Sequence, residues 1–579
     1  MALTPSMRLS VRSTLAAHEA QVMPPMASSI RSLPARRAAV AAGLRVEVTP
    51  SQYPPGVTRQ DALVRLPAAP VGRRLARVYR TISQLLLDAA DRDPDGAWLR
   101  TDDGVWSFAE AAGWVGASMQ RLREAGLVRG GLVVLTARST PGYLISWLAV
   151  CAMGAIAVPT NPRGTWGELS GLLRQTRPRL VVTDGGLREL VAESGVASIP
   201  GLDVLHVNDV VTDERGVIAE PGGFTPDAQP DDVAVLIPTS GTTGRSKLVM
   251  QTHRAYTLAG EGFPYWIGLT PQDRLMTSLP LFHINAPAYS VCGSLAVGAG
   301  LVLLPRFSAS GFLDDARRHG ATQFNAIGAM MELLMRQPQR PDDADNPVRL
   351  CYTGPAPAKP RHLEIERRFG WRVTSGYALS ESPYGLVWQG EERPYGTLGR
   401  PRQHPELGEI NFARVVDEQM VDVPAGGTGE LLLRNPAVTP GYWEMPEETK
   451  AAITEDGWLH TGDLVTGNPD GTYTFVARRK EVIRRRGENL SPLEVEQALE
   501  AHPAVLEAAV IGVPSELSEE DVKAFVVPTG GGGLDFDELR DWVSGRLADF
   551  KVPTLWEQLD SLPRTPTDRV AKHVLRTRR

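Results

Sequence analysis

Short apolar runs alternate with helical stretches along most of the chain beyond about Arg80. The runs Gly131–Leu135, Ala155–Pro159 and Arg179–Thr183 each have the length and the apolar composition of a strand, and helical segments separate them. Strands that alternate with helices at this spacing form parallel sheets that helices cover on both faces. The sequence therefore predicts an α/β fold with covered, mostly parallel sheets.

The length of the chain, 579 residues, is too great for a single core, so more than one domain is expected. After about Arg479 the predicted elements become smaller and more charged, with a helix at Pro492–Glu500. We expect a large domain over residues 79–479 and a small, mobile α+β domain over 480–579. Residues 1–78 are rich in Arg, Ala, Ser and Pro, which favours a poorly ordered extension and also allows a transit peptide or a misplaced start codon.

The composition of the chain limits which partners and which cellular location are expected. A net charge of -6 gives no reason to expect a nucleic-acid partner. The three cysteines are too far apart for a disulfide framework or a metal cluster, which suits a reducing, cytoplasmic location. The longest apolar stretch, Tyr143 to Val158, is short for a bilayer span and contains Ser146 and Gly154, so we expect no membrane span.

A glycine-rich and hydroxyl-rich loop follows a predicted strand at Asp232–Pro238. Its small residues leave backbone N–H groups free to approach phosphate oxygens, and Lys247 adds a mobile positive charge. The loop is not a Walker loop, because Ser246 precedes Lys247 instead of following it and a strand-like segment comes next. The predicted phosphate-binding residues that precede the lysine are Thr239, Ser240, Gly241, Thr242, Thr243 and Gly244.

The string TSGTTGRSK, Thr239 to Lys247, resembles the phosphate loop of the adenylate-forming superfamily. This superfamily includes acyl-CoA synthetases, luciferases and peptide-synthetase adenylation domains. Further motifs follow in the order that the superfamily has, so the resemblance covers roughly residues 80–579. The wording of the motifs is closest to crotonobetaine/carnitine-type and medium-chain acyl-CoA ligases.

The segment Gly376 to Glu381, GYALSE, resembles the superfamily's aromatic–x–x–hydroxyl–Glu signature. The resemblance implies that Tyr377 stacks on adenine, that Ser380 contacts phosphate and that Glu381 holds Mg²⁺, with Thr239 as a second metal contact. Mg²⁺ prefers such a site, with one or two protein oxygens and several substrate oxygens. Upstream, the segment containing Gly354 and Ala356 is similar to the one that lines the adenine.

The turn-rich segment DGWLHTGD ends at Asp463, which matches the superfamily's ribose-binding aspartate. The resemblance implies that Arg478 reaches the ribose or a phosphate and that Lys480 lies at the hinge of the small domain. It also implies that Gly487 approaches the pantetheine arm of coenzyme A, where glycine allows close backbone contact. His283 matches a position that gates the acid pocket in the superfamily, and a buried structural histidine is an equally good interpretation.

The C-terminal run departs from the superfamily pattern. Arg569 falls where a lysine that drives adenylation is usual, and Asp568 replaces the usual glycine. Arginine keeps the positive charge, but its planar fork differs from an ammonium group. Either Arg569 acts in place of that lysine, or Lys572 is recruited, or adenylation is weakened.

The resemblance implies an AMP-forming acid–thiol ligase. Such an enzyme uses ATP and Mg²⁺ to convert a small carboxylic acid to acyl-AMP, releases pyrophosphate, and transfers the acyl group to coenzyme A. One alternative is a ligase that loads a carrier protein. A second is a nucleotide-binding pseudoenzyme, which the departure at Arg569 motivates.

Overall fold

The computed structural model describes most of the chain beyond the first 78 residues, all within one compact unit that spans Val78–Arg579. The described ranges are 79–195, 201–211, 224–239, 246–485, 488–515, 520–530, 532–565 and 570–578. None of the helices in these ranges is both long and apolar enough to cross a membrane. The larger helices are α4 (Ile82–Arg92), α5 (Phe108–Glu124), α6 (Pro141–Ala152), α7 (Trp166–Thr176), α8 (Arg188–Glu193), α10 (His253–Ile267), α12 (Phe312–His319), α13 (Gly328–Met335), α14 (Lys359–Phe369), α16 (Pro492–Glu500) and α17 (Phe536–Ser544).

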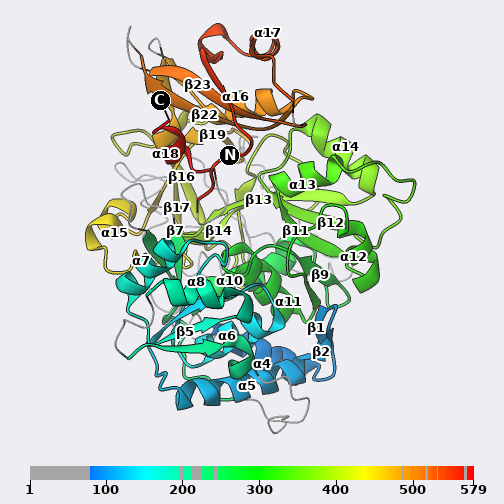
Figure 1. The fold of residues 1–579 in the computed structure, drawn as a ribbon, viewed down its shortest axis with the longest axis vertical. Helices are drawn as coiled ribbons and strands as arrows, with labels where there is room; N and C mark the ends of the chain where they lie inside the picture. The colour runs from blue at the N-terminus through cyan, green and yellow to red at the C-terminus, as the bar shows by residue number, and fades with distance from the viewer. Residues whose placement is uncertain are drawn as a thin grey trace, which may run out of the picture. The chain divides into compact units, whose positions relative to one another are not determined.

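A six-stranded sheet lies in the first part of the unit (Figure 1), with helices on both faces. Val133 and Leu135 of its third strand pack into one core with α5 and α6, whereas Val134 between them packs with α7 and α8. Apolar residues therefore face both sides, as a doubly covered parallel sheet requires. In sheet order the strands are β6 (Asp203–His206), β5 (Leu180–Thr183), β3 (Leu132–Thr136), β4 (Ile156–Pro159), β7 (Val233–Thr239) and β8 (Lys247–Thr252).

A nine-stranded sheet carries a parallel centre with antiparallel strands at both edges. On one face the Phe324 ring lies 4.8 Å from Phe312 of α12, and on the other the Tyr352 ring lies 5.1 Å from Phe263 of α10. Both faces are thus covered, and the prediction of an α/β fold is confirmed. In sheet order the strands are β15 (Arg400–Pro401), β14 (Ser382–Val387), β13 (Arg372–Leu379), β12 (Leu350–Gly354), β11 (Gln323–Ile327), β9 (Arg274–Thr277), β10 (Gly300–Leu303), β1 (Ala97–Thr101) and β2 (Gly104–Ser107).

A four-stranded antiparallel sheet was not foreseen from the sequence, and the turn-rich interpretation of DGWLHTGD is corrected here. Most of that segment belongs to a strand whose buried positions include Thr461 and Asp463. Polar residues at buried positions hide the apolar alternation by which a strand is recognised in a sequence. In sheet order the strands are β16 (Phe412–Val416), β17 (Thr428–Arg434), β18 (Leu459–Gly467) and β19 (Tyr473–Arg478).

The last hundred residues form a smaller domain with a core of its own, in which Ile483, Val495, Val510 and Val526 are buried together. The helix predicted at Pro492–Glu500 is confirmed as α16. A short hairpin and a three-stranded sheet complete this domain (Figure 1). The strands are β20 (Ile483–Arg485) with β21 (Glu488–Leu490), and β22 (Val505–Pro514), β23 (Glu520–Pro528) and β24 (Leu555–Gln558).

Candidate functional site

The predicted phosphate loop connects two antiparallel strands, as the sequence indicated. Thr239 at the end of β7 and Lys247 at the start of β8 are register partners, and the Thr239 hydroxyl donates to the Lys247 carbonyl oxygen at 3.2 Å. The two flanking residues of the loop are therefore fixed by strand pairing. The predicted phosphate-binding residues Ser240, Gly241, Thr242, Thr243 and Gly244 lie outside the described residues.

One tyrosine joins the predicted phosphate-binding lysine to the predicted metal-binding glutamate. The Lys247 ammonium lies 4.7 Å from the centre of the Tyr442 ring, a cation–π contact. The hydroxyl of the same tyrosine donates to Glu381 Oε1 at 3.0 Å. Burial and the neighbouring carboxylate of Glu381 raise the pKa of Tyr442, so the hydroxyl stays protonated and keeps donating.

Hydrogen bonds to backbone carbonyl oxygens hold three distant segments together around this tyrosine. Gln251 Nε2 on β8 donates to the Ser380 carbonyl oxygen at 2.5 Å, and the Thr439 N–H donates to the Glu381 carbonyl oxygen at 2.7 Å. The Thr439 hydroxyl in turn donates to the Met250 carbonyl oxygen at 2.5 Å. The structure thus brings together Lys247, Ser380 and Glu381, which lie up to 134 residues apart in the sequence.

Asp463, the predicted ribose-binding residue, is fully buried on β18. Its Oδ2 accepts a hydrogen bond of 2.5 Å from the Tyr377 hydroxyl, and its Oδ1 lies 2.7 Å from Nε of Arg478, its register partner on β19. Burial and then Asp463 raise the pKa of Tyr377. The structure therefore joins three predicted nucleotide-binding residues.

The ends of β12 and β13 approach each other too closely for side chains. A Cβ atom on Gly354 would lie 2.4 Å from the carbonyl oxygen of Gly376, the residue before Tyr377. Half-buried Ala356 follows Gly354 on the connection to α14. Gly354 and Ala356 therefore lie at the carboxyl end of the strand next to Tyr377, in agreement with a shared adenine-binding edge.

The remaining predicted site residues lie on the small domain or outside the described residues. Lys480 is exposed in a 3₁₀ turn, Arg479–Glu481. The Lys572 ammonium lies 2.7 Å from Glu496 and 3.2 Å from Glu481. Burial lowers the pKa of Lys572, but these two carboxylates outweigh it and leave the pKa above the usual value. The described residues do not include Gly487 or Arg569.

His283 lies near the start of the π-helical segment η4 (Ala286–Val291) and is half-buried. Its ring is 4.4 Å from the ring of Phe282. Its backbone N–H donates to the Pro280 carbonyl oxygen at 3.2 Å, which forms a tight turn.

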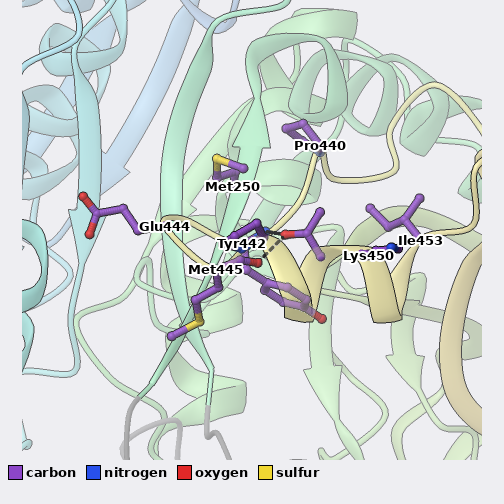
Figure 2. Close-up of a pocket in the computed structure, with 9 residues that line it drawn as sticks. Met250, Pro440, Tyr442, Glu444, Met445, Lys450 and Ile453 are labelled. Carbon is purple, nitrogen blue, oxygen red and sulfur yellow. Dashed lines mark hydrogen bonds between the residues drawn. The ribbon is translucent and has the colours of Figure 1, made fainter.

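A cavity of ≈ 500 Å³ lies beside Tyr442 (Figure 2) and is lined mainly by apolar side chains. The Tyr442 N–H donates to Thr449 Oγ1 at 2.9 Å, which fixes the tyrosine against the short helix α15 (Pro446–Ala452). Only Glu444 and Lys450 are charged among the lining residues, so the lining offers one positive group for a triphosphate. Lys247 and Glu381, which both contact Tyr442, are not among the lining residues of this cavity.

Two residues that organise the site, Tyr442 and Glu430, were not predicted from the sequence. Tyr442 lies in GYW, after Gly441, where a Cβ would come within 2.4 Å of Thr449, and that glycine was the available signal. Glu430 on β17 accepts hydrogen bonds from the Gly462 N–H at 3.0 Å and from Arg479 at 3.0 Å, which holds the strand that carries Asp463. A single glutamate in a strand gives no sequence signal of this role.

Two family models match this chain. Residues 86–443 match the family model described as AMP-binding enzyme, and residues 494–569 match the AMP-binding enzyme C-terminal domain. The crotonobetaine/carnitine–CoA ligase of Salmonella paratyphi C is 30% identical over 492 residues, 81% of this chain and 93% of the relative.

Two solved structures are similar over most of the chain. ATP-bound MatB from Rhodopseudomonas palustris has a TM-score of 0.75 and 29% identity, and covers 86% of this chain and 98% of its own. The o-succinylbenzoate CoA synthetase (MenE) of Bacillus subtilis, in complex with its acyl-adenylate intermediate, has a TM-score of 0.75 and 25% identity, with 87% and 99% coverage.

The fold and the family matches define a nucleotide-dependent ligase with a large α/β domain and a smaller C-terminal domain. The chain belongs to the AMP-binding enzyme family, the adenylate-forming superfamily that the motifs indicated. It is an AMP-forming acid–thiol ligase.

We predict that Tyr442→Phe lowers ATP-dependent turnover, because Glu381 loses the hydroxyl that fixes it while Lys247 keeps the ring. A hydrogen bond to a charged group is worth about 1.5–3 kcal/mol, so the rate should fall roughly 10- to 100-fold. Tyr265→Phe is the matched control, since Tyr265 is 49% exposed. Steady-state pyrophosphate release measures both variants, and equal rates for Tyr442→Phe and wild type would contradict the assigned role.

Proposed function

We propose that this enzyme activates a small carboxylic acid as its acyl-AMP and transfers the acyl group to coenzyme A. The observation that carries the proposal is the convergence of Lys247 and Glu381 on Tyr442. A cation for the phosphates and a carboxylate for a metal are thereby placed around a single anchored side chain. The names of the similar CoA ligases support coenzyme A as the acceptor.

Mg²⁺ fits the residues present. Among the described residues, no three acidic or histidine side chains form a metal cage. Mg²⁺ normally binds through one or two protein oxygens together with substrate phosphates. We assign Glu381 and the Thr239 hydroxyl as the protein contacts. The ion would neutralise charge on the phosphates when the carboxylate attacks.

The residues of the chain have different roles in the proposed reaction, according to their positions. Lys247 and the loop hydroxyls draw charge from the departing pyrophosphate, and Ser380 adds a contact to phosphate. Tyr377, Gly354 and Ala356 hold the adenine. The acid itself approaches past His283. The small domain turns about Lys480 and presents Gly487 to the pantetheine arm for the second step.

Asp463 and Arg478 bind the ribose in this proposal. We predict that Asp463→Asn raises the KM for ATP roughly 10- to 100-fold, because hydrogen bonds to a charged acceptor worth about 1.5–3 kcal/mol are weakened. Asp456→Asn is the matched control, since Asp456 is exposed in the same segment. Thermal unfolding checks that both variants are folded. An unchanged KM for ATP in folded Asp463→Asn would refute the ribose assignment.

Arg569 is proposed as the C-terminal group that stabilises adenylation, because the ammonium of Lys572 is engaged by Glu481 and Glu496. Arg569→Ala should slow pyrophosphate release by roughly 10²–10³, the usual loss for one preorganised contact, and should spare thioester formation from supplied acyl-AMP. Lys572→Met should lower the melting temperature and change pyrophosphate release little.

The opposite pattern, in which Lys572→Met abolishes adenylation and Arg569→Ala does not, would transfer the role to Lys572. Arg569→Lys decides between enzyme and pseudoenzyme. An activity within about tenfold of wild type supports a site adapted to arginine. An inactive wild type together with an active Arg569→Lys variant would support the nucleotide-binding pseudoenzyme.

A further inference from the structure

A row of buried polar side chains crosses three strands of the nine-stranded sheet. Asn325 of β11, Tyr352 of β12 and Thr374 of β13 are register partners, so their side chains lie on one face. Each is at most 4% exposed. Parallel strands that are covered on both faces are normally apolar throughout. This row is therefore a departure that packing alone does not explain.

The π-helical segment η4 packs over this polar row. The ring of Tyr289 in η4 lies 5.8 Å from that of Tyr352, and the Ser290 hydroxyl accepts a hydrogen bond of 3.0 Å from Asn325 Nδ2. π-Helical turns are rare and occur frequently at functional sites. The element that covers the polar row is thus itself of a kind associated with ligand binding.

Asn325 has hydrogen-bonding capacity to spare. Its Nδ2 donates to Ser290 and to Asn285 Oδ1 at 3.2 Å, whereas its Oδ1 has no partner among the residues that the structure describes. If the side-chain amide of Asn325 were flipped so that Oδ1 and Nδ2 exchanged positions, Nδ2 would be the atom without a partner. A buried polar group in this state is destabilising, so Asn325 Oδ1 calls for a partner that the described residues do not supply. Asn285, which accepts one of these hydrogen bonds, is half-buried.

A buried cation lies next to the same row. The side chain of Arg402 is fully buried, and its partners among the described residues are neutral. Its guanidinium donates to the hydroxyls of Tyr289 at 2.6 Å and Tyr352 at 2.5 Å, and to two carbonyl oxygens. A charge buried without a counter-ion makes the surroundings favourable for an anion and unfavourable for a cation.

The polar row and Arg402 lie directly beneath the candidate site. A Cβ on Gly376 would meet the Tyr352 hydroxyl at 2.3 Å and Arg402 Nη2 at 2.8 Å, so only glycine allows the strand to pass over them. The next residue, Tyr377, bonds to Asp463. Ligands of open α/β sheets bind at the carboxyl ends of the strands, where Gly376 and Tyr377 lie on β13.

We propose that Asn325, Ser290 and Arg402 form the wall that recognises the tail of the acid, and that this tail is short and carries a neutral or anionic hydrogen-bonding group. An alkyl tail would leave Asn325 Oδ1 without a partner among the described residues. A quaternary ammonium tail, as in crotonobetaine or carnitine, would face the charge of Arg402. The inference rests on the proposed acid activation and adds to it the class of acid.

Four acids with the same four-carbon backbone test the inference on the full-length wild-type enzyme. They are butanoate, 3-hydroxybutanoate, succinate and carnitine, and pyrophosphate release with ATP and Mg²⁺ gives kcat/KM for each. We expect 3-hydroxybutanoate or succinate to exceed both butanoate and carnitine at least about tenfold, since sites built around hydrogen bonds reject analogues that lack them. Butanoate or carnitine as the preferred acid would overturn the inference. Hexanoate and benzoate are added, and release with these alone would overturn it as well.

Substitutions of Asn325 or Ser290 test whether these residues determine the preference for a polar acid. Asn325→Leu should reduce the preference for the polar acid at least about tenfold while butanoate is retained. Gln323→Leu is the matched control, because Gln323 is equally buried on the same strand and face, two residues earlier. Ser290→Ala, which removes the other end of the contact, replaces Asn325→Leu if that variant does not fold. A preference that is unchanged in the folded wall variant would overturn the inference.

Different results would contradict the proposed acid activation and the inference about the tail of the acid. Pyrophosphate release that occurs with an apolar or cationic acid contradicts the wall and leaves acid activation standing. Release with none of the six acids, although ATP binds, contradicts the proposed activation and the inference that rests on it.

Discussion

The hydrogen bond from the Tyr377 hydroxyl to Asp463 Oδ2 joins two sheets, which also share an apolar core. Tyr377 belongs to the nine-stranded sheet and Asp463 to the four-stranded sheet. A fully buried carboxylate is costly unless it is paired and hydrogen-bonded, and here Tyr377 and Arg478 supply both kinds of partner. The edge where the two sheets meet is consequently fixed at the point where the nucleotide is proposed to lie.

Tyr442 performs a similar task on the phosphate side. Its ring contacts the Lys247 ammonium and its hydroxyl contacts Glu381, while its backbone is tied to α15 through Thr449. Tyr377 is the second residue of the GYALSE segment, and Tyr442 contacts Glu381, the last residue of that segment. The polar side chains of one short strand end are thereby preorganised, which is the condition for electrostatic stabilisation of a developing charge.

Much of the fold could be predicted from the sequence, because covered parallel strands are apolar and punctuated by helices of recognisable length. The helix Pro492–Glu500 and the strands that flank the phosphate loop are examples. Strand β18 could not be recognised, since two of its four buried positions, Thr461 and Asp463, are polar. Without β18, the four-stranded sheet could not be predicted either.

For the same kind of reason, some residues of the candidate site could be predicted from the sequence and others could not. Motif residues such as Asp463 and Glu381 carry their own signal, whereas Tyr442, Glu430 and Asn325 act through contacts with segments distant in sequence. Arg402 also falls in this second group, because neither its burial nor its neutral partners can be inferred from its neighbours in the chain. The motif residues thus indicated the class of chemistry, and the contacts that bear on the acid emerged only from the fold.

Acid-dependent exchange of labelled pyrophosphate into ATP, measured without coenzyme A, tests the central claim most directly. Reversible formation of acyl-AMP predicts exchange that requires both Mg²⁺ and a carboxylic acid and that proceeds in the absence of any thiol. Exchange that is absent with every acid, or that appears only when coenzyme A is added, would contradict the account.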